Sequence, residues 1–105
     1  MATISLHIQQ TSYLGKIVGL IGKKKPEPIM LKTRFGIHTF GVLHPIDVLI
    51  LNKQNKVVVL KKSLKPFRLF FWSPLHDTVI ELPEGTIQKK KLTIGDIVHF
   101  IIIDS

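Results

Sequence analysis

DVLILNKQNKVVVL, residues 47–60, is the stretch that decides the expected fold. Two apolar runs, residues 48–51 and 57–60, are joined by the polar residues 52–55, a connection of the length that links the strands of a β-hairpin. Valine and isoleucine are branched at Cβ, which restricts χ1 and suits a pleated strand better than a helix. The stretch therefore predicts a hairpin within a mostly β protein.

Further short strands are expected on both sides of this hairpin. Residues 4–8 alternate between apolar and polar side chains, which is the period of a half-buried strand. Glycine and proline punctuate the remaining apolar segments and keep them short. The other expected strands cover residues 29–35, 37–43, 78–82 and 97–103.

Two helical pieces complete the expected fold. Thr11 or Ser12 can cap a short helix that Gly22 ends, because apolar residues recur at helical spacing from Leu14 onward. Residues 86–91 predict a single helical turn. We therefore expect a mostly β (α+β) fold: one domain over residues 1–105, built as a compact antiparallel β-barrel or half-barrel with one short N-terminal helix.

The charge balance favours solubility or diffuse attraction to polyanions over specific recognition. The 105 residues include 15 Lys and Arg against 7 Asp and Glu, a net charge of +8, and only Arg34 and Arg68 are arginines. Lysine is a mobile, strongly hydrated point charge, whereas arginine binds phosphates and base edges through two donors at once. The lysine runs at 23–25 and 89–91 are expected to be solvated. Lysine and isoleucine enrichment is also typical of thermophilic proteins.

Several classes of protein are excluded or disfavoured. The chain has no cysteine, which excludes disulfides, thiolate catalysis and cysteine-ligated metals. Its longest apolar runs fall far short of the ~20 residues that cross a bilayer as a helix. Residues 1–10 lack the features of a signal peptide, so we expect a cytoplasmic protein. The sequence contains no G-x-S-x-G motif and no phosphate-binding glycine loop, and no cofactor is expected.

The densest polar chemistry lies within residues 34–47. If 37–44 is a strand, His38 and His44 share one face, and the turn at Pro45 could bring Asp47 toward either imidazole. The favoured interpretation of Asp47 is structural, with its carboxylate capping backbone N–H groups of the turn. No established zinc spacing is present, so neither a metal site nor a catalytic set is assigned. The candidate binding residues of this block are Arg34, His38, Thr39, Phe40, His44 and Asp47.

A second candidate region is aromatic. Four aromatic residues lie between Pro66 and Pro74, close to a group of lysines at 61–65. We favour a core position for these rings over an exposed ligand groove, and an exposed groove over stacking on nucleic acid. The rings are Phe67, Phe70, Phe71 and Trp72, and Arg68 and Trp72 complete the candidate binding residues.

Three stretches resemble one known family. They are GIHTFGVLHPIDV (36–48), LKPFR (64–68), and ELPEG (81–85) followed by IGD (94–96). In this order they resemble the domain of unknown function 192 family, from about Ile17 to Phe100. His38 stands where many members carry Trp, Val42 where Met is expected and His44 where an apolar residue is usual. The resemblance implies a small β-rich fold with few helices; many relatives are exported or lipid-anchored, and no activity is implied.

Three functions stay open. The leading hypothesis is a binding or accessory module for a small ligand or protein, with a pocket near residues 34–47 walled by residues 67–72. The alternative is binding of polyanions or single-stranded nucleic acid through the lysine runs and the aromatic rings. The third is a metal-assisted hydrolase using His38, His44 and Asp47.

Overall fold

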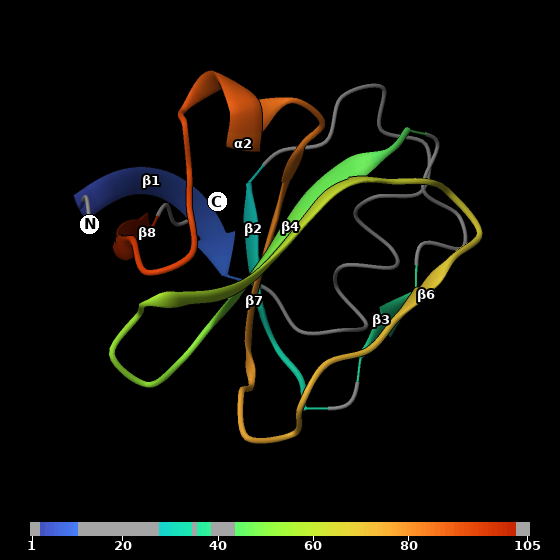
Figure 1. The fold of residues 1–105 in the computed structure, drawn as a ribbon, viewed down its shortest axis with the longest axis horizontal. Coiled ribbons are helices and arrows are strands. Elements are labelled where there is room, and N and C mark those ends of the chain that lie inside the picture. The colour runs from blue at the N-terminus through green and yellow to red at the C-terminus, as the bar shows by residue number, and fades with distance from the viewer. Residues whose placement is uncertain (1–2, 11–27, 35, 39–43, 103–105) are drawn as a thin grey trace.

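The structure, a computed structural model, describes residues 3–10, 28–34, 36–38 and 44–102 (Figure 1). This part of the chain is dominated by short strands, with a single turn of helix after the seventh strand. The elements are β1 (Thr3–Gln10), β2 (Ile29–Lys32), β3 (Ile37–His38), β4 (Ile46–Leu51), β5 (Val57–Leu64), β6 (Leu69–Phe70), β7 (Thr78–Pro83), α2 (Thr86–Lys89) and β8 (Ile97–Ile102).

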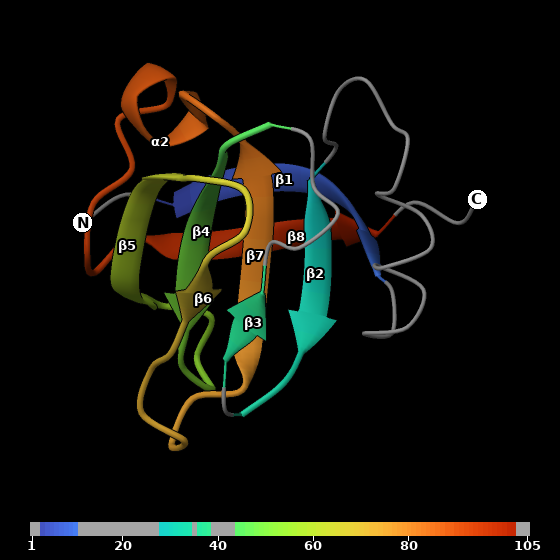
Figure 2. The same ribbon diagram turned by 90° about the vertical axis from the view of Figure 1, so that its right-hand side faces the viewer.

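Four antiparallel strands form the centre of the main sheet, in the order β5-β4-β7-β2. β1 and β8 extend this sheet beyond β2, and a separate pair of short strands joins β3 to β6. Figure 2 shows the β3–β6 pair lying in front of the sheet formed by β4, β7 and β2. The mostly β fold with a short helix is therefore confirmed.

The expected antiparallel barrel or half-barrel is confirmed only in part. β1 runs parallel to both β2 and β8, so the sheet is not antiparallel throughout. No closed barrel forms among the described residues, where β5 and β8 lie at the two ends of the strand order. These end strands meet only near the bridge between Lys56 and Ile97, where the N–H of Val98 donates to the carbonyl of Asn55 at 2.8 Å. Parallel pairing requires a long connection, which local sequence patterns do not reveal.

Apolar side chains cover both faces of the central sheet. All six residues of β4 are buried, because alternate side chains enter two different clusters. Leu49 and Leu51 pack with Ile87 of α2 in the first cluster, whereas Val48 and Ile50 pack with Ile37 of β3 in the second. A strand buried on both faces is continuously apolar, which explains the run at 48–51. We call these sides the α2 face and the β3–β6 face; Figure 1 shows them on opposite sides of the sheet.

The expected elements match the structure to different degrees. The 52–55 connection is a hairpin turn, the carbonyl of Asn52 accepting from the N–H of Asn55 at 3.0 Å. The expected strand at 29–35 ends at Lys32, and the helical turn expected over 86–91 covers 86–89. The expected helix at 12–22 lies outside the described residues, as does the end of the expected 37–43 strand.

Candidate functional site

Asp47 is a buried residue whose carboxylate accepts hydrogen bonds from two backbone N–H groups. Its side chain lies on the α2 face, between Ile46 and Val48 of the second cluster in sequence. One carboxylate oxygen, Oδ1, accepts from the N–H of Ser63 at 3.0 Å, and Oδ2 accepts from the N–H of Ile87 at 2.9 Å. The carboxylate therefore bridges the end of β5 and the first turn of α2.

The other residues of the 34–47 block do not gather around Asp47. β3, which carries His38, lies on the face of the sheet opposite to the Asp47 carboxylate. His44 and Arg34 are exposed at bends of the chain. Thr39 and Phe40 lie outside the described residues. The described residues contain no cluster of three His, Asp or Glu side chains able to hold a metal ion.

A bulge at the end of β5 shapes the neighbouring surface. Ile46 pairs with Leu64 and Val48 with Lys61, so three steps along β5 oppose two steps along β4. Ser63 takes up the extra residue with a φ of 54°, in the left-handed region that few residues adopt. Its N–H is the one that donates to Asp47, so the buried carboxylate stabilises the bulge from behind.

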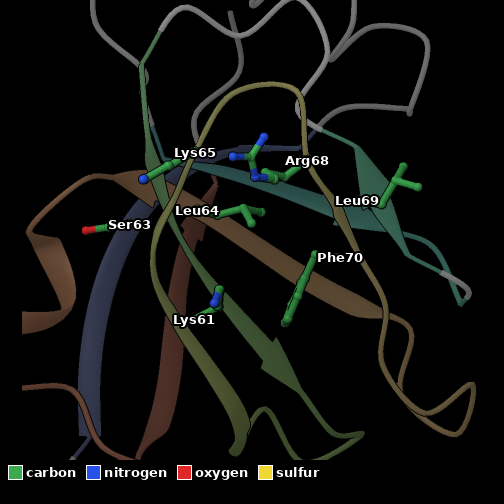
Figure 3. A pocket seen from close by; sticks show the side chains of 7 residues that line it. All are labelled: Lys61, Ser63, Leu64, Lys65, Arg68, Leu69 and Phe70. Atoms are coloured by element: carbon green, nitrogen blue, oxygen red, sulfur yellow. The ribbon is translucent and has the colours of Figure 1, made fainter.

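Beyond this bulge the chain forms a basic groove of about 390 Å³. Figure 3 shows Lys61 and Leu64 of β5 on one side, and on the other Arg68, just before β6, and Phe70 of β6. The exposed cations lie on the β3–β6 face, since Lys61 pairs with Val48 of the second cluster. The lining residues are Lys61, Ser63, Leu64, Lys65, Arg68, Leu69 and Phe70, and we call this the basic groove.

The sequence around the groove has one sign of charge. Between Asp47 and Asp77 the chain carries six Lys and Arg residues and neither Asp nor Glu. β6 also pairs with β3, so that Leu69 lies opposite His38 and the groove adjoins the 34–47 block. The groove therefore lies on the 61–70 segment, which pairs through β6 with β3 of that block.

Two of the four aromatic rings are structural. Phe70 and Trp72 pack against the second cluster, with ring centroids 5.9 Å apart and planes inclined at 46°. The indole Nε1–H of Trp72 donates to the carbonyl of His76 at 2.7 Å, which closes the turn after β6. The expectation of a core position is right for these two rings, and Trp72 is a packing residue of the segment.

The other two rings face solvent. Phe67 is 66% exposed and Phe71 is 64% exposed, so the expectation of a core position is wrong for both. The reason is the alternation of an extended chain, in which residues of one parity point inward and those of the other point outward. Pro66 and Phe67 form the turn that sets this phase, and four rings close together in sequence give no sign of it.

The lysine run at 89–91 lies elsewhere. Lys89 and Lys90 line a second cavity of about 710 Å³ on the α2 side, together with Glu84. This run therefore does not join Arg68 on the β3–β6 face. The run at 23–25 lies outside the described residues.

No helix in the described part of the chain has the length and apolar character needed to span a membrane. The residues that sequence reasoning missed are Ser63 and Leu64, which line the groove at the bulge. A bulge depends on how two distant strands pair, and neither residue stands out locally. The lysines at 61 and 65 were placed near the rings by sequence alone, and the structure places both in the groove.

Two curated proteins of archaea are similar in sequence. The UPF0127 protein PYRAB11210 of Pyrococcus abyssi is 38% identical over 72 residues, which cover 67% of this chain and 61% of that protein. The UPF0127 protein PH1112 of Pyrococcus horikoshii is 32% identical over 91 residues, which cover 81% of this chain and 78% of that protein. The chain thus matches somewhat less than two thirds of the length of the first of them.

Solved structures and a family model complete the comparison. A protein of unknown function from Novosphingobium aromaticivorans aligns with a TM-score of 0.69 at 12% identity, over 84% of this chain and 69% of its own. A protein from Sinorhizobium meliloti 1021 aligns with a TM-score of 0.68 at 12% identity, over 84% of this chain and 76% of its own. The model of the family DUF192, described as "Uncharacterized ACR, COG1430", matches residues 18–100. With the expected resemblance confirmed at this length, the chain belongs to the DUF192 (UPF0127) family, whose function is unknown.

Proposed function

We propose that this protein is a binding module that receives a phosphate-bearing ligand in the basic groove. The observation that carries the proposal is the composition of the groove. It combines Lys61, Lys65 and Arg68 with the hydroxyl-bearing Ser63, and no carboxylate stands among the described residues that line it. Such a set of groups attracts an anion and presents several hydrogen-bond donors to it.

Each type of side chain contributes differently to such a ligand. The planar guanidinium of Arg68 can donate two parallel hydrogen bonds to one phosphate, while Lys61 acts as a mobile point charge. Phe70 supplies an apolar wall beside these cations. A volume of about 390 Å³ lies at the lower end of the range typical of small-molecule sites. The groove therefore suits a ligand of nucleotide size.

The other candidate regions support a ligand less well. Both carboxylate oxygens of Asp47 accept backbone hydrogen bonds on the α2 face, and these bonds support a structural role for this residue. The cavity beside α2 mixes the carboxylate of Glu84 with Lys89 and Lys90, so its charge favours anions less. The basic groove is the better site for an anion.

The test is an NMR titration of the ¹⁵N-labelled protein with pyrophosphate and with AMP. We expect the amide signals of residues 61–70 to shift, together with those of β3, because β3 pairs with β6. Replacing Lys61→Gln and Arg68→Gln together should weaken binding at least tenfold, since each charge-assisted hydrogen bond contributes about 1.5–3 kcal/mol.

The matched control removes the same charge elsewhere. Lys53 in the hairpin turn and Lys89 in α2 are both exposed and lie outside the groove. The K53Q/K89Q variant should therefore bind pyrophosphate within about twofold of the wild type, because neither lysine lines the groove and salt screens exposed charges. Equal weakening in both double variants, or shifts scattered over the chain, would contradict the proposal.

A further inference from the structure

Residues 67–75 present a row of apolar side chains to solvent. Phe67 and Phe71 are about two-thirds exposed, and Leu69 between them is 58% exposed. Figure 3 shows Leu69 and Phe70 pointing to opposite sides of β6, so the chain directs one side chain inward and the next outward. We call the outward side chains the outer row; they are Phe67, Leu69, Phe71 and Leu75.

The backbone adopts an unusual conformation at Phe67 and packs against the ring of Phe71. Phe67 has a φ of 60°, a left-handed conformation that is exceptional for a bulky residue. The ring of Phe71 lies against Gly36, where a Cβ atom would stand only 2.6 Å from Cδ1 of that ring. A ring backed by main chain on one side and open to solvent on the other is a preorganised surface for a flat partner.

The two rings flank one cation of the basic groove, Arg68. Arg68 follows Phe67 directly, and its Nη1 donates to the carbonyl of Phe67 at 3.4 Å. Phe70, which lines the groove, precedes Phe71. The three residues between the two exposed rings, 68–70, therefore all line the groove.

We infer that the basic groove and the outer row together bind single-stranded nucleic acid, an inference that rests on the proposed function of the groove. Phosphates bind Lys61, Lys65 and Arg68, and bases stack on Phe67 and Phe71. This is the pairing of a cationic groove with aromatic platforms that binders of single strands use. Four residues of extended chain span at most about 13 Å. A stacked strand rises by ~3.4 Å per nucleotide, so the site spans about four nucleotides.

The fixed rings favour nucleic acid over a lipid surface or an apolar protein partner. A lipid or protein surface would use the two leucines of the outer row as fully as the two phenylalanines, because the hydrophobic effect depends on area. Stacking on a base requires a ring face, and the phenylalanines are the residues that the backbone constrains. The two chemistries are therefore separated by changing the rings and the leucines independently.

The experiment measures fluorescence anisotropy of fluorescein-labelled dT4, dT8 and dT16 at 50 mM NaCl. The Phe67→Leu and Phe71→Leu double variant keeps the apolar area and removes the ring faces. It should bind dT8 at least about fivefold more weakly, since stacking contributes about 1–3 kcal/mol per base. The matched control, Leu75→Ser, changes a leucine of the outer row that does not line the basic groove, and it should stay within about twofold of the wild type. Affinity should rise from dT4 to dT8.

Salt dependence reports the phosphate contacts. Three contacts predict a slope of about −2 for the logarithm of the association constant against that of salt concentration, at about −0.7 per contact for single strands. The K61Q/R68Q variant should reduce the slope to about −0.7. An unchanged slope in this variant would exclude the groove as the phosphate site.

Other outcomes overturn the inference without touching the proposed function. Absence of dT8 binding while pyrophosphate binding persists removes nucleic acid and leaves the phosphate groove. Wild-type affinity in the ring variant, confirmed to be folded by circular dichroism, excludes stacking; should that variant unfold, Phe67→Leu alone decides. Equal loss in the leucine variant, or tighter binding to vesicles of phosphatidylcholine and phosphatidylglycerol (7:3) than to dT16, assigns the outer row to an apolar surface instead.

Discussion

At the scale of single residues, Asp47 connects two distant segments of main chain through hydrogen bonds. Substituting it tests how the structure beneath the groove is stabilised. Asp47 is 1% exposed, and its two oxygens accept from the N–H groups of Ser63 and Ile87. In Asp47→Asn, an amide NH₂ must face one of these donors. We expect the free energy of unfolding in urea to fall by about 1.5–3 kcal/mol, as for hydrogen bonds to charged groups.

Asp77→Asn provides the matched control for this substitution. Asp77 is half-buried, and its Oδ1 accepts from the hydroxyl of Thr78 at 3.3 Å, an interaction that an amide oxygen can retain. Its loss of stability should stay below about 1 kcal/mol. Equal losses in the two variants would show that the carboxylate of Asp47 has no special supporting role.

Gly36 allows the backbone of Phe70 and the ring of Phe71 to approach it closely. A Cβ atom at this position would stand 2.6 Å from the carbonyl oxygen of Phe70 and 2.6 Å from Cδ1 of Phe71, and the φ of 153° is one that L-residues rarely adopt. Gly36→Ala should therefore lower the free energy of unfolding by about 1–3 kcal/mol and perturb the fluorescence of the single tryptophan, Trp72.

Gly85→Ala separates backbone strain from crowding. Gly85 has a φ of 89°, yet a Cβ atom there would meet nothing within 4 Å. This variant carries the conformational cost without the clash, so its loss of stability should be the smaller one. A loss of stability as large as that of Gly36→Ala would show that backbone strain alone explains both losses and that crowding at Gly36 contributes nothing.

The role of Asp47 was predictable in kind and its partners were not. The sequence favours a carboxylate that caps backbone N–H groups, and the structure shows this chemistry. The expected donors were those of the adjacent turn, whereas the actual donors lie 16 and 40 residues away. Hydrogen-bonding capacity belongs to a residue, but the choice of partner depends on tertiary packing.

The 52–55 turn shows at the scale of elements why the hairpin could be predicted. The Oδ1 atom of Asn52 accepts from the N–H groups of Gln54 at 2.9 Å and Lys56 at 3.0 Å. Asn52→Ala removes this local acceptor and should lower the free energy of unfolding by about 0.5–1.5 kcal/mol in urea denaturation. Gln54→Ala, a change at an exposed position of the same turn, should alter it by no more than about 0.5 kcal/mol. Reversal of this order would contradict the capping role.

The aromatic segment could not be assigned in the same way. The sequence shows that four aromatic residues lie close together, but the position of the turn at Pro66 and Phe67 decides which rings pack inward. That turn uses a left-handed phenylalanine, which sequence propensities do not anticipate. Local signals thus fixed the strand pairs joined by short connections, and missed the segment whose orientation depends on one unusual backbone conformation.

At the scale of the whole molecule, the sheet places the Asp47 carboxylate and the basic groove on opposite faces. Asp47 and α2 occupy one face, while the basic groove and the outer row belong to the other. Net charge alone did not reveal this division, because the three lysines at 89–91 contribute as much to the sum as the two lysines and one arginine of the groove. The individual strands could be predicted from hydrophobic patterns. Their order in the sheet could not, because the pairing of strands remote in sequence produces no periodic pattern.

The parallel pairing of β1 with β8 also has a consequence for how the chain folds during synthesis. Thr3 pairs with Ile97, and the register continues to Ile8 and Ile102, whereas β1 shares only two residue pairs with β2. Synthesis runs from the amino end, so β1 leaves the ribosome first and finds most of its hydrogen-bond partners only when β8 follows. Contacts of such long range form slowly and leave an open strand edge in the meantime. In a nascent chain of this protein, β1 therefore completes its pairing only after β8 has emerged from the ribosome.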